Sequence, residues 1–304
     1  MNKISTIYVK ELNSINEIFK ENSLLPNLFK RIILFFKQVL CILTIKENGI
    51  CVLPYKNIKN KAIINVITKI IAKNTQSVVL SNYLNNVEYV TKSLINRKVH
   101  IYNGKILSNY LIYNFVEYIS KLKNEETYLQ EVSILVNNCN SLNTENIIYL
   151  ANKLKRINIV TNKINNFNKI STYLENKMGI GITITNNKRK SLAKAKIIIN
   201  IDFNEETLNQ FNINKDAIIV NINNSVEIKT KLFNGINVYD YYIEYDKKLD
   251  NELLKYFDQK LIYESMISKN NYDEIMESIV RDNLQIVDLV GKNGIINEME
   301  YKRN

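Results

Sequence analysis

Residues 156–201 read RINIVTNKINNFNKISTYLENKMGIGITITNNKRKSLAKAKIIINI, in which short apolar runs alternate with amphipathic stretches. The runs 157–161, 182–185 and 197–201 are rich in isoleucine and other β-branched residues, which favour strands. Between the first two runs, Phe167, Ile170 and Leu174 recur at helical spacing. Because parallel strands need helical crossovers, this stretch predicts part of a doubly wound α/β sheet.

The same alternation extends to both sides of this stretch. Further strands are expected at 132–136 and 217–222, and residues 237–245, rich in tyrosine and β-branched side chains, are expected to form the last strand. Nearer the start of the chain, the runs 4–9, 50–53, 77–80 and 99–102 alternate with helical stripes. We therefore predict an α/β protein of two domains, with a Rossmann-like parallel sheet in the second and a smaller α/β layer in the first.

The domain boundaries follow from a change in composition. A chain of 304 residues is long enough for two cores. A long helical stripe at 105–123 is followed by the polar segment 124–130, where we place a boundary. The prediction is an N-terminal α/β domain at 1–124 that ends in a long connecting helix, a Rossmann-like domain at 125–248, and C-terminal helices at 249–304. In one interpretation these last helices pack back on the first domain.

The charge balance points to an anionic partner without identifying one. The chain has 41 Lys and Arg against 30 Asp and Glu, a net charge of +11, which favours binding to a nucleotide, nucleic acid or lipid surface. The excess is lysine spread along the whole chain, which is more typical of a general compositional bias. Nucleic acid is therefore disfavoured but stays open, as does a small anionic ligand. The oligomeric state is not predicted.

The cysteine and histidine content restricts the chemistry. The three cysteines Cys41, Cys51 and Cys139 are an odd number without CxxC spacing, which predicts a reducing, cytoplasmic setting. Cys41 and Cys51 lie in apolar runs and are expected to be buried, and Cys139 lies in a predicted loop. With His100 as the one histidine, a His-rich metal site is excluded, and we predict no metal site.

The most apolar segment of the chain is 24–45. Lys30, Arg31, Lys37 and Gln38 interrupt it, so its longest apolar stretch falls far short of the roughly 20 residues that span a bilayer. We predict no transmembrane span, and we interpret the segment as a buried amphipathic helix that leads into a strand. A helix lying in a membrane interface is the alternative, because basic residues flank the apolar face.

Ligands of open parallel sheets bind beyond the carboxyl ends of the strands, where the strand order reverses. The corresponding segments here are 137–143, 161–166, 186–190, 202–204 and 221–225, and asparagine dominates them. Asparagine can hydrogen-bond ribose or carbonyl groups, but it is a poor nucleophile and a negligible base. No catalytic residue is predicted.

The run ITITNNKRK at 182–190, followed by AKIIIN at 195–200, resembles the second and third strands of the NADP-binding domain in the shikimate dehydrogenase family. In that family an Asn-Arg pair at the end of the second strand receives the adenosine 2′-phosphate. The resemblance implies an NADP site in which Asn187 and Arg189 form this pair, although Lys188 stands between them. It also implies a glycine-rich turn at 161–167, where the chain reads TNKINNF and contributes Asn162 and Lys163. The predicted cofactor-binding residues are thus Asn162, Lys163, Asn187 and Arg189.

Two local charge clusters lie in the same region. Lys188, Arg189 and Lys190 open a predicted helix, where positive charge opposes the helix dipole unless an anion binds there; a solvated basic face is the simpler interpretation. Asp202, Glu205 and Glu206 are expected to stabilise the start of the next helix.

The missing glycines decide between the functional hypotheses. Glycines in this position allow the tight turn and let the backbone approach the pyrophosphate closely. Side chains at the same positions block that approach. The leading hypothesis is therefore a cytoplasmic, Rossmann-like protein with a degenerate or unconventional nucleotide or anion site. This hypothesis includes a protein without catalytic activity. The alternatives are an NAD(P)-dependent oxidoreductase that acts in an interdomain cleft, and a basic regulatory protein that binds nucleic acid or a membrane surface.

Overall fold

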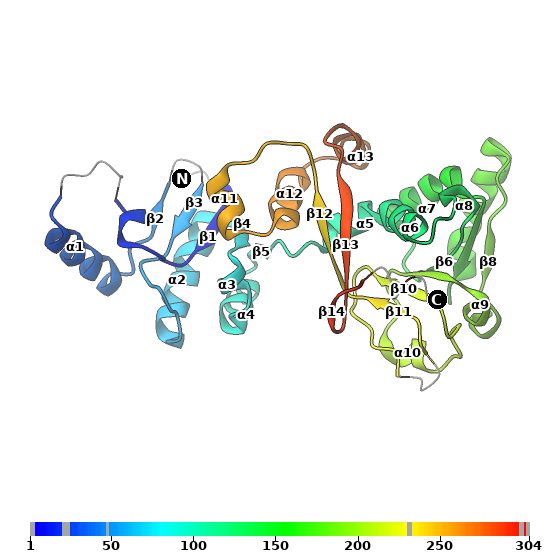
Figure 1. Ribbon diagram of the computed structural model, residues 1–304, viewed down its shortest axis with the longest axis horizontal. Coiled ribbons are helices and arrows are strands. Elements are labelled where there is room, and N and C mark those ends of the chain that lie inside the picture. The colour runs from blue at the N-terminus through cyan, green and yellow to red at the C-terminus, as the bar shows by residue number, and fades with distance from the viewer. Residues whose placement is uncertain (1–3, 20–24, 47–48, 230–232, 298–300, 302–304) are drawn as a thin grey trace. The chain divides into compact units, whose positions relative to one another are not determined.

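The computed structural model describes residues 4–19, 25–46, 49–229, 233–297 and 301. Its contacts divide the chain into a first unit, Met1–Gly104 with Lys248–Lys269, and a second unit, Lys105–Lys247 with Asn270–Asn304. Both units combine parallel strands with helices, which confirms the predicted α/β class (Figure 1). The domain boundaries at 124/125 and 248/249, as limits of independently folding parts, stay a prediction.

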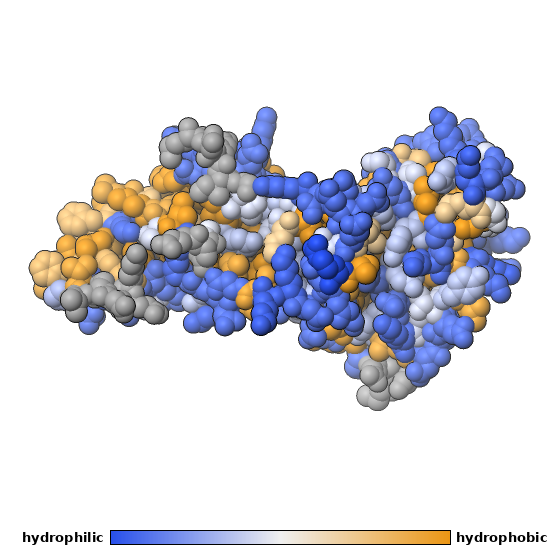
Figure 2. Space-filling view, turned by 90° about the horizontal axis from the view of Figure 1, so that it is seen from above, coloured by the Kyte–Doolittle hydropathy of each residue, from blue (hydrophilic) through white to orange (hydrophobic). Residues whose placement is uncertain are grey.

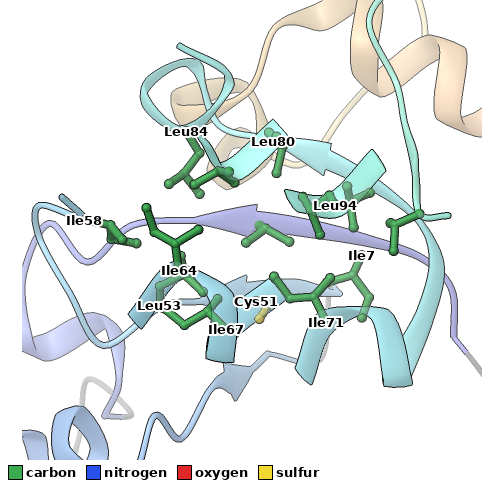
Figure 3. Packing of buried hydrophobic residues seen from close by; sticks show 14 residues of the cluster. Ile7, Cys51, Leu53, Ile58, Ile64, Ile67, Ile71, Leu80, Leu84 and Leu94 are labelled. Carbon is green, nitrogen blue, oxygen red and sulfur yellow. The ribbon is translucent and has the colours of Figure 1, made fainter. Parts of the chain in front are cut away.

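The first unit contains a five-stranded sheet in the order β2-β3-β1-β4-β5. Its strands are β1 (Ile4–Lys10), β2 (Thr44–Ile45), β3 (Ile50–Val52), β4 (Thr75–Leu80) and β5 (His100–Ile101), all parallel except β2. The connecting helices α2 (Lys61–Asn74), α3 (Asn82–Asn85) and α4 (Glu88–Asn96) cover one face. Figure 3 shows Ile64, Ile67 and Ile71 of α2 packed toward Ile7 and Cys51 of the strands. This burial of apolar helix stripes on β-branched strands is the pattern expected of a parallel sheet.

The opposite face of the same sheet is covered by a segment from late in the chain. Helices α11 (Asn251–Tyr256) and α12 (Gln259–Ile267) bring Phe257, Leu261 and Ile262 onto Ile50 and Val79 of the sheet. Burial on both faces is consistent with β3, which is apolar and buried throughout, and with β4, in which every residue except Gln76 is buried. The first unit is therefore built from two separate parts of the sequence.

The second unit contains a six-stranded, fully parallel sheet in the order β11-β10-β9-β6-β7-β8. Its strands are β6 (Glu131–Leu135), β7 (Arg156–Val160), β8 (Thr183–Thr185), β9 (Ile197–Asn200), β10 (Ile218–Asn221) and β11 (Ile236–Val238). The helices that follow the first four are α7 (Ser141–Lys153), α8 (Ile164–Met178), α9 (Lys188–Lys194) and α10 (Glu205–Asn209). With β6 counted as the first strand, the order is 3-2-1-4-5-6, which is the strand order of dinucleotide-binding Rossmann domains. The Rossmann-like architecture is thus confirmed by topology.

The rest of the second unit differs from the sequence-based expectations in three places. The predicted helix 105–123 is interrupted at Leu111 (φ −94°, ψ 12°), which separates α5 (Lys105–Tyr110) from α6 (Ile112–Leu122). The predicted strand 237–245 is two strands, since β11 stays in the parallel sheet while β12 (Asp240–Glu244) pairs antiparallel with β13 (Gln285–Gly291). After α13 (Tyr272–Arg281) the described residues form β13 and β14 (Gly294–Ile295), where a continuing helix was expected. The alternating burial of β12 fits a sheet with one packed face.

Helix α1 (Asn27–Val39), which follows the short 3-10 helix η1 (Ile15–Glu17), contradicts the expected buried helix. Its large apolar side chains lie in solvent, with Leu28 67% and Phe35 60% exposed, while Lys30 is buried. Periodicity locates an apolar face but does not say which way that face points. In the part of the chain that the structure describes, no helix is long and apolar enough to cross a bilayer.

Candidate functional site

The switch point of the Rossmann-like sheet lies between β6 and β9, which are neighbours in the sheet but not in the sequence. A crevice at such a point is the usual ligand site of this fold. The turn from β6 into α7, residues 136–141, reads VNNCNS and contains no glycine. Every residue of the turn therefore carries a side chain where a dinucleotide needs bare backbone.

A carboxylate of the chain itself occupies the backbone donors of this turn. Asp202, just after β9, accepts from the Asn137 N–H at 2.8 Å (Oδ1) and 3.0 Å (Oδ2), and from the Asn138 N–H at 2.8 Å (Oδ2). In a dinucleotide-binding Rossmann domain, N–H groups of this turn face the pyrophosphate. The anion-binding position is thus filled by an internal anion, and the residues present do not fit a conventionally bound NAD(P).

This geometry corrects the position of the turn that the resemblance implied. The glycine-rich turn was expected at 161–167, after the run 157–161 taken as the first strand. That run forms β7, which is the second strand, and β8 and β9 are the third and fourth. The fingerprint position is therefore 136–141, one strand earlier in the sequence.

Two of the predicted binding residues, Asn162 and Lys163, lie at the exposed end of β7. The Asn162 N–H donates to Asn137 Oδ1 at 2.8 Å, and its side-chain oxygen accepts a hydrogen bond from Lys188 Nζ. Lys163 begins α8 with an exposed side chain, and its N–H donates to Thr161 Oγ1 at 3.0 Å. The structure thus joins Asn162 to the switch-point turn, whereas Lys163 contributes only charge at its rim.

The other two predicted residues, Asn187 and Arg189, lie at the start of α9, and their role as a phosphate-binding pair stays a prediction. The Asn187 side chain caps α9 by accepting from the Lys190 N–H at 3.1 Å. Arg189 is exposed on the first turn of that helix. Lys188, which separates them in the sequence, turns toward the strand ends, where its Nζ lies 5.9 Å and 5.8 Å from the ring centres of Phe203 and Phe211.

Sequence reasoning missed the roles of Asn137 and Asp202. The Asp202 carboxylate was expected to stabilise the start of α10, where Asn204 is in fact the N-cap. The signal that could have found it is its position, because a carboxylate directly after a central strand of a parallel sheet lies next to the turn that follows the neighbouring strand.

Asparagine amides hold the strand ends on the other side of the switch point. Asn200 Nδ2 donates to Asn221 Oδ1 at 3.0 Å, and Asn221 Nδ2 donates to Asn237 Oδ1 at 2.6 Å, so that β9, β10 and β11 are linked side chain to side chain. Asn237 Nδ2 donates in turn to Val226 O and to Tyr239 Oη. These amides are satisfied by one another, by backbone and by the Tyr239 hydroxyl, which stabilises this edge.

The first unit carries a buried charged cluster at the carboxyl end of β1. Lys10 has a fully buried side chain, and its Nζ lies 2.9 Å from Glu17 Oε2 and 3.3 Å from the ring centre of Tyr256. Burial raises the pKa of the Glu17 carboxyl, but the nearby Lys10 ammonium and hydrogen bonds from the Asn13 N–H and the Tyr256 hydroxyl outweigh it and leave this pKa below its usual range. The cluster is internally paired and contributes to packing at this end of the sheet.

Acidic, histidine and cysteine side chains are the remaining groups that could support metal or thiol chemistry. Within the described ranges, no group of three His, Cys, Asp or Glu side chains is placed to hold a metal ion. Burial raises the pKa of the Cys51 thiol to about 12, so this cysteine is chemically inert at neutral pH. Cys139 is half-buried in the switch-point turn, and its Sγ donates to Asn166 O at 3.2 Å.

No protein-family model and no curated protein sequence matches the chain. Among solved structures, it is similar to L-tryptophan dehydrogenase from Nostoc punctiforme, with 10% identity, a TM-score of 0.32, and 76% of this chain and 66% of that one covered. Ornithine carbamoyltransferase from Gloeobacter violaceus gives 10% identity, a TM-score of 0.29, and coverages of 77% and 79%. The A chain of dipicolinate synthase from Bacillus subtilis gives 11%, 0.30, and coverages of 54% and 53%. The chain thus spans just under two thirds of the first of these proteins. The strand order of the six-stranded sheet, and not these similarities, identifies the fold.

Proposed function

We propose that this chain is a non-catalytic Rossmann-type binding protein whose dinucleotide position is closed by its own Asp202. The observation that carries the proposal is the set of three short contacts from the Asn137 and Asn138 N–H groups to this carboxylate. A phosphate in the same place would have to displace the carboxylate or lie beside it. The first loses charge-assisted hydrogen bonds, and the second places like charges together.

The remaining polar groups at the sheet edge support the same function. Asn200, Asn221 and Asn237 bond to each other and to backbone, so they offer little to a substrate. Outside the closed turn the rim is basic, because Lys163 and Arg189 extend into solvent. This arrangement favours an anionic ligand or partner bound at the outer rim over a nucleotide held in the crevice.

The experiment is a thermal-shift titration with NAD, NADP and inorganic pyrophosphate on three proteins. These are the wild type, Asp202→Ala, and the matched control Glu206→Ala, which removes a carboxylate from the exposed start of α10. A ligand at a hundred times its dissociation constant stabilises a protein by about 2.7 kcal/mol, a shift of several degrees. We expect no shift for the wild type or the control, and a pyrophosphate-dependent rise for Asp202→Ala, in which the N–H groups are free.

Two results would count against the proposal. A saturable shift of the wild-type protein with NAD or NADP would favour the alternative function, an NAD(P)-dependent oxidoreductase. If the folded Asp202→Ala protein shows no shift of its melting temperature with pyrophosphate, the Asn137 and Asn138 N–H groups are not a latent anion site.

A further inference from the structure

Helix α1 is oriented the opposite way from an ordinary surface helix. Such a helix buries its apolar stripe and exposes its charges. Here the apolar stripe is outermost, with exposed fractions from 44% to 67%. Its members are Leu28, Phe29, Ile32, Phe35, Phe36, Val39 and Leu40, which we call the α1 face. Figure 2 shows these apolar residues gathered at the left of the view, where α1 lies in Figure 1.

Polar contacts within the first unit hold the helix in this orientation. Lys37 Nζ donates to Thr44 Oγ1 at 2.7 Å, and Gln38 Nε2 donates to Pro54 O at 2.9 Å. Lys30, about two helical turns before Lys37 and Gln38, is only 8% exposed. The inward side of α1 thus combines these polar contacts with Leu34, which packs against the core of the first unit, and together they fix the outward direction of the apolar face.

The area of the α1 face is larger than a free surface usually tolerates. With side chains of this size, the exposed fractions correspond to an apolar patch on the order of 700 Å². The largest patch on a typical monomer is about 300–600 Å², and larger patches mark sites of protein or membrane binding. Ile42 and Ile45, which follow the helix in the sequence, are also exposed, at 44% and 45%.

The charges around the face select the partner. α1 contains no acidic residue. Of its three basic residues, Lys30 and Lys37 lie on the inward side, and Arg31 is exposed beside the apolar stripe. An exposed aromatic and aliphatic face that is bordered by a basic residue and contains no acid is compatible with the interface of an anionic bilayer. A second copy of the chain would instead place one acid-free basic helix against another, and the net charge of +11 adds to that repulsion.

We propose that the α1 face docks on the surface of a bilayer that contains anionic lipid, with the helix parallel to the membrane plane. Leu28, Phe35 and Phe36 enter the boundary between headgroups and acyl chains, and Arg31 contacts the lipid phosphates. The inference is independent of the proposed function, since it concerns the first unit and none of the groups at the switch point.

The absence of tryptophan from the chain gives a direct test. Phe36→Trp places a single indole on the α1 face, and Ile95→Trp places one at a 61% exposed position on α4 as the matched control. Each full-length protein is titrated with vesicles of phosphatidylcholine alone and with an equal mixture of phosphatidylcholine and phosphatidylglycerol. We expect a blue shift of the fluorescence for Phe36→Trp with the mixed vesicles, at least tenfold weaker binding to phosphatidylcholine alone, and no shift for Ile95→Trp.

Vesicle flotation of the unlabelled protein completes the test. Phe35→Ser with Phe36→Ser should reduce binding to mixed vesicles at least tenfold, and Ile95→Ser should leave it unchanged; circular dichroism checks that each variant folds. Equal binding of both variants, or no binding of the wild type, overturns the proposal. So does a concentration-dependent dimer in analytical ultracentrifugation that the Phe35 and Phe36 substitutions abolish, because the face would then be occupied by a second copy.

Discussion

The buried pair of Lys10 and Glu17 gives a quantitative prediction for the first unit. In Glu17→Gln the ammonium of Lys10 stays fully buried but loses its carboxylate, and the ring of Tyr256 remains as its partner. Removing one member of a buried pair costs about 3–5 kcal/mol. Because the Glu17 side chain is 13% exposed, we expect the lower end, about 3 kcal/mol, which lowers the melting temperature of a domain of this size by roughly 10 °C.

A double-mutant cycle separates the loss of the pair from the loss of packing. Lys10→Met removes the charge and keeps a similar length of apolar chain. We expect the double variant Lys10→Met, Glu17→Gln to be more stable than Glu17→Gln alone by about 2 kcal/mol, because no unpaired buried charge remains. Urea unfolding followed by far-UV circular dichroism gives the free energies, and hydrogen exchange of the β1 amides assigns them to the first unit.

The opposite outcome is equally clear. If Glu17→Gln costs less than about 1 kcal/mol and the two substitutions are additive, the pair behaves as an exposed one. The burial of Lys10 would then not predict the free-energy cost of removing its carboxylate partner, which would refute the expectation derived from this geometry.

The remaining predictions concern pH, the switch point and the thiols. The folded-state pKa of Glu17 lies below its unfolded value. Its contribution to stability is therefore present above about pH 4.3 and is lost as the pH falls through the folded pKa. The acid side of a curve of stability against pH should accordingly be shallower in Glu17→Gln. Asp202→Asn keeps one acceptor but turns an amide donor toward an N–H group. It should lower the free energy of unfolding of the second unit by about 1.5–3 kcal/mol, measured by urea unfolding. An unchanged midpoint of the urea unfolding curve would contradict the bonding described. Mass spectrometry after iodoacetamide treatment at neutral pH should find Cys139 labelled well before Cys51, whose burial holds its pKa at about 12.

The parallel sheets were predictable because their strands are marked by composition. Runs such as IIIN at 197–200 and IIVN at 218–221 are buried on both faces and bounded by polar turns, so their existence and type follow from the sequence alone. Their order does not, because the apolar runs resemble one another and only hydrogen-bond register distinguishes the first strand from the second. That is why the turn at 136–141 was assigned to 161–167.

The candidate site was predictable only as a location. The segments beyond the strand ends contain Asn137, Asn162 and Asp202, as expected for a parallel sheet. The contact between Asp202 and the N–H groups of Asn137 and Asn138 joins residues more than sixty positions apart, and no local pattern encodes it. The direction of the α1 face was unpredictable for a similar reason, because it depends on what Lys37 and Gln38 meet across the fold.

The division of the first unit between two stretches of sequence sets the order of events during synthesis. The sheet face that carries Ile50 and Val79 is covered by α11 and α12, and the ribosome must add all of 105–247 before it makes them. At about 5–20 residues per second, the nascent sheet waits on the order of ten to thirty seconds for its cover. During that interval an apolar surface is open to chaperones. A chain truncated before residue 248 would lack α11 and α12, so this sheet face would stay uncovered and the polypeptide would be prone to aggregate.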